Sequence, residues 1–460
     1  MERENKMGYM PVPKLIINMS LPLMFSLLIQ SLYNIVDSIF VARLGQDALT
    51  AVSLAYPMQI LMIAVAVGTS VGINSLLSKS IGAKDPELTG NTATTGVLLA
   101  LVGAVVFMLL GLFAVDGFVS MFTDDPVIGG ACGGYLSICM LFCLGSFMST
   151  MFQRFLQSVG NTFGSMLTLV AGAVTNLILD PIMIFGLLGL SAMGVRGAAI
   201  ATVIGQWVSA LCAVTLNHFR NPTVRPRLRG YRLEKRILAD IYRVGLPTII
   251  TQALGSVMVS AINGILMPLS AASVAFFGVY YKLHNFLFMP MNGLGQAAIP
   301  IVGYNYGAGN PDRVRAVIRS AVPMAGGVAL LATVIFCALP GQLLGLFDAE
   351  VEMLAIGIPA LRVISVTFVF AAVTTVLGYA ASGLGNGVIN MVSSALRQVV
   401  LLVPLVWILA GSIGVEAVWY AFWVAEPVAA LYAAVSIVRL LRKRGILAAK
   451  EPTAQKEPAE

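Results

Sequence analysis

Charged side chains are scarce in this sequence. Lys, Arg, Asp and Glu together make up 11% of the 460 residues, whereas 58% of the residues are hydrophobic, and the mean hydropathy is +0.89. A typical soluble domain has about 25% charged residues. The composition therefore excludes an ordinary soluble enzyme or binding module, and it predicts a membrane protein whose spans lie in the lipid bilayer.

Histidine and cysteine are also scarce, with two and five residues. The cysteines fall in apolar segments without the spacing of a metal site, so we interpret them as small buried hydrophobic side chains. The stretch "GTSVG" (68–72) has the pattern of serine hydrolases, which place this serine between a strand and a helix. Here the pattern lies within an apolar run, and His218 and His284 lie in a basic linker and in a later apolar run. We therefore expect neither an enzyme nor a cofactor.

Long apolar runs dominate the chain instead. About 20 apolar residues suffice to cross a bilayer as a helix. Such runs recur twelve times, near residues 15–41, 51–77, 93–115, 132–155, 164–188, 195–217, 241–267, 273–302, 316–338, 355–381, 388–411 and 415–438. The sequence thus predicts an all-α membrane protein with twelve transmembrane helices.

The distribution of Lys and Arg predicts the orientation in the membrane. With the N-terminus inside, 24 of the 28 basic residues fall on or near cytoplasmic segments, and the external loops are acidic, as in "DGFVSMFTDDP" and "FDAEVEML". Basic residues favour the cytoplasmic side, so we expect a multi-pass plasma-membrane protein with both termini in the cytoplasm. This topology accounts for the net charge of +7, and no nucleic-acid-binding motif accompanies it.

The sequence contains an internal duplication. An offset of 225 residues aligns Pro22 with Pro247 and "GAKDP" (82–86) with "GAGNP" (307–311). Each half contains six predicted helices, an even number, so both halves enter the membrane from the same side as a parallel repeat. We expect two pseudo-symmetric six-helix lobes around a central cleft, a construction typical of transporters. The predicted parts are an N-terminal lobe (1–219), a basic cytoplasmic linker (220–240), a C-terminal lobe (241–440) and a cytoplasmic tail (441–460).

Four of the 21 acidic residues fall within the predicted spans; Glu416 lies at the very start of one, and the candidates that lie deeper are Asp37, Asp180 and Glu426. An ionisable group inside a membrane is costly and commonly marks an ion or substrate pathway. Tyr33 precedes Asp37 by four residues, and Asn176 precedes Asp180 by four, so each pair lies on one helix face. We expect Thr202 of the sixth span to join them. Such a cluster suits a shared proton or a small hard cation.

A purely structural role is the alternative for this cluster, since polar side chains also hold membrane helices together by hydrogen bonds. The positions 225 residues after Asp37 and Asp180 are Ile262 and Leu405, so the second lobe does without these carboxylates. Pro22 removes a backbone hydrogen bond within the first span, which produces either a static kink or a hinge.

Three stretches give the chain a family resemblance: "SLPLMFSLLIQSLYNIVDSIFVARLG", "VTNLILDPIMIFGLLGLSAMGVRGAAIATVIGQ" and "GLGQAAIPIVGYNYGAGNPDRVR". With the twelve spans, they resemble the multidrug and toxic compound extrusion (MATE) family over about residues 10–440, and the MepA-like bacterial branch most. The resemblance implies a monomeric efflux antiporter, driven by H+ or Na+, that exports lipophilic cationic drugs. It assigns the family's bend in the first helix to Pro22 and its cation site to Tyr33, Asp37, Asn176, Asp180 and Thr202. If the ion is Na+, the ligands would be Asp37, Asn176 and Asp180.

The second lobe carries polar and soft side chains that suit a substrate cavity. The residues that we assign to it are Lys282, His284, Met289, Met291 and Glu426. The family's second cation site, with acids in the seventh and tenth spans, is not matched, because those spans contain none. Lys282, Arg362 and Arg397 keep an alternative open, a flippase for lipid-linked saccharides, because the pyrophosphate of such substrates needs a basic cavity.

Overall fold

The structure is a computed structural model that describes residues 5–227, 231–347 and 350–447. Over these ranges the chain is helical and contains no strand. Ten helices are long and apolar enough to cross a membrane unbroken, and two bent helix pairs bring the number of spans to twelve. The predicted all-α fold with twelve spans is therefore confirmed.

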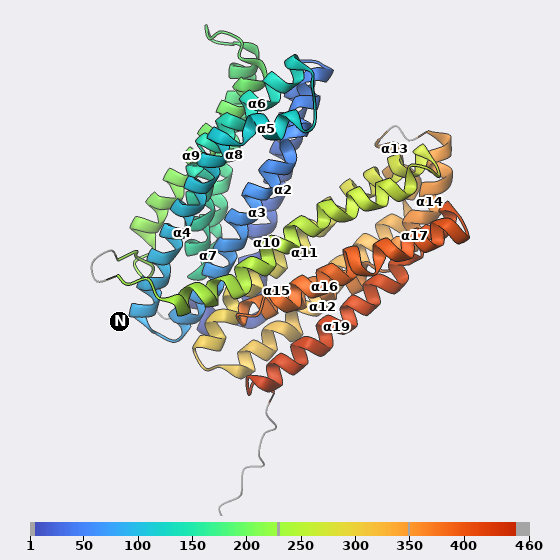
Figure 1. The fold of residues 1–460 in the computed structure, drawn as a ribbon. Coiled ribbons are helices and arrows are strands. Elements are labelled where there is room, and N and C mark those ends of the chain that lie inside the picture. Colours follow the sequence, from blue (N-terminus) through green and yellow to red (C-terminus); the bar gives the residue numbers. More distant parts are fainter. Residues whose placement is uncertain (1–4, 228–230, 348–349, 448–460) are drawn as a thin grey trace, which may run out of the picture.

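The helices follow in chain order as α1 (Lys6–Tyr9), α2 (Val12–Ala42), α3 (Gln46–Gly82), α4 (Pro86–Phe113), α5 (Val115–Ser120), α6 (Pro126–Leu141), α7 (Leu144–Ser158), α8 (Thr162–Phe185), α9 (Gly194–Arg220), α10 (Lys235–Leu266), α11 (Ala271–Gly307), α12 (Pro311–Ala338), α13 (Pro340–Gly345), α14 (Val351–Ser365), α15 (Phe368–Gly383), α16 (Val388–Ala395), the π-helix η1 (Leu396–Val400), α17 (Leu402–Ser412), α18 (Val415–Val418) and α19 (Ala421–Lys443). Figure 1 shows two bundles, the N-lobe with α2–α9 and the C-lobe with α10–α19.

Ordinary end signals set several of these boundaries. Asp85 accepts a hydrogen bond from the Leu88 N–H (2.9 Å) at the start of α4, and Asp125 caps α6 in the same way. In both helices a proline follows the cap, at a position where its missing N–H costs nothing. Because helices satisfy their own backbone groups, such apolar segments can lie in lipid without exposed polar backbone.

The duplicated sequence folds in duplicate. The fourth span is bent by 47° between α6 and α7, and the tenth is bent by 51° between α14 and α15. The short helices α5 and α13 begin at residues 115 and 340, which again differ by 225. The irregular features of the fold therefore repeat with the same offset as the sequence, as a parallel repeat requires.

The two lobes pack against each other through glycines that are related by the repeat. A Cβ atom at Gly82 would collide with the backbone oxygen of Tyr304, and one at Gly307 would collide with that of Lys79. Both pairs are equivalent, since 82 + 225 is 307 and 79 + 225 is 304. These glycines let α3 and α11 approach until their backbones touch, close to a pseudo-two-fold axis.

One arginine lies buried at this lobe interface. Arg154 of α7 donates to the side-chain oxygens of Gln157 (2.7 Å) and of Gln296 in the C-lobe (3.0 Å). Its equivalent in the repeat is Tyr379, which is also its neighbour in space. The pseudo-two-fold axis therefore has the guanidinium of Arg154 on one side and the phenol of Tyr379 on the other.

The short helix α1 connects the two lobes at the end of the molecule where the described chain begins. The Asn5 amide donates to the backbone oxygen of Val159 in the N-lobe (3.2 Å). The backbone oxygen of Met7 accepts from Asn305 (3.0 Å) and Arg313 (3.1 Å) in the C-lobe. Helix α19 also ends at this end of the molecule (Figure 1). From it the ribbons of the two lobes diverge toward the opposite end.

Candidate functional site

The N-lobe contains a polar cluster built from α2, α8 and α9. The Asn176 amide donates to the Asp180 carboxylate (3.1 Å) and lies 3.4 Å from the Thr202 hydroxyl oxygen. Asp180 is fully buried and Asn176 is nearly so. The spacing of four residues places Asn176 and Asp180 one turn apart on the same face of α8, as the sequence predicts.

The remaining two residues of the predicted cation site come from α2. The Asp37 carboxyl group is a direct neighbour of the Asp180 carboxyl group, and the Tyr33 phenol lies beside both. The structure therefore brings together all five residues that were assigned to one site from the sequence. Their role in coupling stays a prediction.

Three buried oxygens in this cluster accept no hydrogen bond from any described residue: Asp37 Oδ1, Asn176 Oδ1 and Asp180 Oδ2. Neither aspartate forms an ion pair with a basic residue in the described part of the chain. A buried acceptor without a partner is costly, and a buried carboxylate without a counter-charge is more so. A proton or a small cation between the two carboxyl groups would remove this cost.

The donor set bears on which ion fits. Within the described ranges, no group of three His, Cys, Asp or Glu side chains converges, so this cluster offers two carboxylates and no third ligand of these types. A Na+ ion here would therefore have two carboxylates and the amide oxygen of Asn176, all hard oxygen ligands. A proton would need only the two carboxyl groups. The cluster is chemically suited to either ion.

Sequence reasoning missed two neighbours of the cluster. Gln59 of α3 donates to the Tyr135 hydroxyl of α6 (3.3 Å), and Tyr135 lies close to both Asp37 and Asp180. A polar residue in each of two apolar spans was the available signal. Nothing in the sequence placed α3 and α6 against α2 and α8.

Pro22 lies inside α2, which runs unbroken through it. The Ser26 hydroxyl donates to the Pro22 backbone oxygen (2.9 Å) and so remains bonded to the helix. Pro247, its equivalent, lies inside α10 in the same way. A hinge at Pro22 stays a prediction.

The C-lobe contains a cavity of about 250 Å³ between α10, α11, α15, α19 and the η1 region. Polar and aromatic side chains line it, including Tyr280, His284, Phe288, Arg397, Gln398 and Glu426. Two of the five residues that we assigned to a substrate cavity, His284 and Glu426, are therefore part of this one. Glu426 is paired with Arg397, whose Nη2 lies 3.1 Å from its Oε1.

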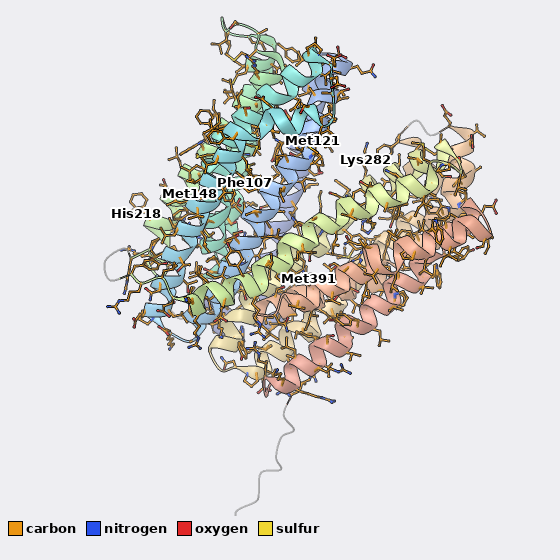
Figure 2. The ribbon with its side chains drawn as sticks, viewed as in Figure 1. Phe107, Met121, Met148, His218, Lys282 and Met391 are labelled. Carbon is orange, nitrogen blue, oxygen red and sulfur yellow. The ribbon has the colours of Figure 1, made fainter. Side chains whose placement is uncertain are left out.

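The other three assigned residues lie elsewhere. Lys282 is exposed, and Figure 2 shows it on the part of the C-lobe where the two lobes diverge. Met291 is fully buried in the hydrophobic core of the C-lobe, and Met289 does not line the cavity. Lys282, Met289 and Met291 are thus not among the residues that line the cavity of His284 and Glu426, and a substrate cavity shared by all five stays a prediction. A substrate contact elsewhere stays a prediction for Lys282.

The basic residues of the C-lobe do not form a basic cavity. Arg397 is neutralised by Glu426, Arg362 donates to the backbone oxygen of Cys337 (3.3 Å), and Lys282 is exposed. The hydrolase pattern is likewise without support. Ser70 lies inside α3 with its hydroxyl bonded to the Val67 backbone oxygen (2.9 Å), and His218 lies on the outer surface of the N-lobe (Figure 2).

Two repeated lobes of six spans, one with a buried carboxylate cluster and one with a polar cavity, define a multi-pass membrane transporter. The MatE family model matches residues 22–182 and again 247–408, which together make up most of the chain. The chain therefore belongs to the MatE family of multidrug efflux transporters. The two matched segments begin 225 residues apart, in agreement with the duplication.

Relatives and solved structures agree with this family. The chain is 26% identical to the multidrug export protein MepA of Staphylococcus saprophyticus over 433 residues, covering 92% of this chain and 93% of that protein. Identity to MepA of Staphylococcus aureus is 24%, covering 94% and 95%. A structure of an outward-facing multidrug resistance MATE transporter superposes with a TM-score of 0.89 at 26% identity, covering 96% and 99%. A transporter of the same superfamily from Pyrococcus furiosus gives 0.88 at 25% identity, covering 97% and 99%.

Proposed function

We propose that this protein is an antiporter that takes up H+ or Na+ and exports lipophilic cationic drugs by alternating access. The observation that carries the proposal is the pair of adjacent carboxyl groups, the half-buried Asp37 and the fully buried Asp180, which form no ion pair with a basic residue in the described part of the chain. Relatives named for multidrug export support the substrate class. They do not favour the flippase alternative, and neither do the scattered basic residues of the C-lobe.

The proposed cycle starts from a lobe arrangement like the present one. With both termini in the cytoplasm, the lobes are closed toward the cytoplasm and diverge toward the outside. An ion that enters from outside neutralises the Asp37 and Asp180 pair, which removes the repulsion between two carboxylates. Helix α2 then repacks at Pro22 and reduces the space available to a lipophilic cation in the N-lobe. The protein acts as a monomer in the plasma membrane.

The decisive experiment is ethidium counterflow in proteoliposomes, with pH and Na+ gradients imposed separately. We expect one gradient to drive ethidium transport in the wild type. Asp37→Asn and Asp180→Asn are nearly isosteric and permanently neutral, so each should abolish gradient-driven transport while the purified protein stays folded.

The matched control is Asp116→Asn, which removes an acid of α5 that is outside the cluster. It should transport like the wild type. Driven ethidium transport in Asp37→Asn at wild-type rates would refute the coupling role of the cluster, and transport driven by neither gradient would refute antiport itself.

A further inference from the structure

The C-lobe cavity contains a second charged site of a different kind. Arg397 and Glu426 form an ion pair (3.1 Å), and Glu426 is 5% exposed. One polar atom of each has no hydrogen-bond partner in the described part of the chain, namely Arg397 Nε and Glu426 Oε2. A buried ion pair normally needs further hydrogen bonds to offset the loss of hydration. Both residues line one cavity, and the pair leaves one buried donor and one buried acceptor unsatisfied among the described residues.

The backbone is modified where this pair is built. Arg397 lies in η1, a π-helical turn between α16 and α17, and such turns are frequent at functional sites. The neighbouring Gln398 also lines the cavity with an unpartnered oxygen. In the repeat, Arg397 and Glu426 correspond to Gly172 and Ala201. A Cβ atom at Gly172 would lie 2.7 Å from the Gly205 backbone oxygen, so the N-lobe helices are in close contact there.

Aromatic side chains form another wall of the cavity. The rings of His284 and Phe288 are stacked with centroids 3.9 Å apart, and Tyr280 contacts Phe422 edge to face at 5.8 Å. All four line the cavity. A planar ring of a ligand would find favourable stacking and edge contacts here.

The charges decide which ligand fits. A simple cation near Glu426 would be repelled by Arg397, and a simple anion near Arg397 would be repelled by Glu426. A compound with a carboxylate next to an ammonium group meets an opposite charge at each end, and the planar guanidinium suits a carboxylate well. We infer that the C-lobe cavity binds small aromatic zwitterions, with the carboxylate on Arg397 and the ammonium group on Glu426.

This inference rests on the proposed function only in treating the zwitterion as an exported substrate, because binding itself needs no ion gradient. The two proposals assign different functions to the two lobes. Coupling belongs to the unpaired carboxylates of the N-lobe, and recognition of zwitterions belongs to the ion pair of the C-lobe.

Three indole compounds test the inference by calorimetric titration of the purified full chain in detergent. L-tryptophan carries both charges, tryptamine lacks the carboxylate, and indole-3-propionate lacks the ammonium group. Each charge-assisted hydrogen bond is worth at least about tenfold in affinity. We expect tryptophan to bind on the order of tenfold or more tightly than either analogue. Equal or tighter binding of tryptamine, or no binding of tryptophan, would overturn the inference.

The double variant Arg397→Gln/Glu426→Gln removes both charges and leaves a hydrogen-bonded amide pair. It should bind the three compounds with similar, weak affinity, and a preserved preference for tryptophan contradicts the site. If this variant does not fold, Arg397→Lys keeps the charge but loses the Nε donor, and it should weaken tryptophan binding while leaving tryptamine binding unchanged. Undiminished tryptophan binding in that variant would also overturn the inference.

Asp180→Asn separates the two proposals. It should bind tryptophan like the wild type even though driven transport is lost. Loss of tryptophan binding in Asp180→Asn would place the zwitterion in the N-lobe instead and refute the C-lobe site. Preserved binding together with undiminished driven transport would refute the coupling role and leave the C-lobe site intact.

Discussion

The N-lobe holds the half-buried Asp37 beside the fully buried Asp180, without a basic partner among the described residues, whereas the C-lobe buries Glu426 against Arg397. Each site is missing from the other lobe, where the equivalent residues are apolar or small. They are Ile262 and Leu405 in the C-lobe, and Ala201 and Gly172 in the N-lobe. The same helical scaffold thus carries two acidic groups without a counter-charge in the N-lobe. In the C-lobe it carries one acidic and one basic group, whose charges balance.

The two lobes share several residues that shape the backbone. Prolines stand at 22 and 247, glycines at 82 and 307, and both lobes bend their fourth span. The comparison shows that the repeat preserves helix geometry and lobe contact. The charged residues Asp37, Asp180, Arg397 and Glu426 have no charged counterpart at the equivalent positions of the other lobe.

Labelling with impermeant thiol reagents tests whether the two lobes are a parallel repeat. Each introduced cysteine either reacts from outside intact cells or does not. Asp125 and Glu350 are equivalent positions before α6 and α14. In a variant without native cysteines, Asp125→Cys and Glu350→Cys should both react from outside intact cells, because parallel repeats place them on the same side. Arg227→Cys, in the linker, should react only after the cells are opened.

Opposite labelling of Asp125→Cys and Glu350→Cys would show that the repeats are inverted. Labelling of Arg227→Cys from outside would reverse the orientation of the whole chain.

Breaking the C-lobe pair should destabilise the protein more than neutralising an N-lobe acid. Arg397→Gln leaves Glu426 buried without a counter-charge, which costs about 3–5 kcal/mol of unfolding free energy. Adding Glu426→Gln should recover much of this loss. Asp180→Asn should cost far less, because no ion pair is lost. Denaturant unfolding in detergent checks the series, and equal losses in Arg397→Gln and Asp180→Asn would remove the contrast between the lobes.

Substitution of either interface glycine should destabilise the protein by a similar amount, and by less than breaking the C-lobe ion pair. A methyl group at either Gly82 or Gly307 meets a backbone oxygen of the opposite lobe, and overpacking of this kind costs about 1–3 kcal/mol. Gly82→Ala and Gly307→Ala should therefore lower the thermal unfolding temperature by similar amounts. Gly326→Ala on α12, where a Cβ meets nothing within 4 Å, is the control and should not lower it. Clearly unequal effects would contradict the reciprocal packing.

The sequence predicted what depends on local periodicity. Span lengths, the repeat, and the pairing of Asn176 with Asp180 all follow from apolar runs and a spacing of four residues. The partnership of Arg397 with Glu426 could not be predicted, because they lie 29 residues apart on different spans and η1 changes the helix register. The burial of Met291 in the C-lobe core could not be predicted either, because a largely apolar span does not reveal which face meets the core.

The contact between the lobes has the form of a two-fold homodimer, in which every contact occurs twice. An ancestor made of two separate six-helix chains would have formed both backbone contacts with one glycine, and any mutation there would have acted on both sides at once. The same symmetry would have placed the residue at the position of Arg154 close to its own copy, where two arginines repel each other. A single chain is free of this constraint. Arg154 faces Tyr379 here, and a mutation changes one side of the axis alone.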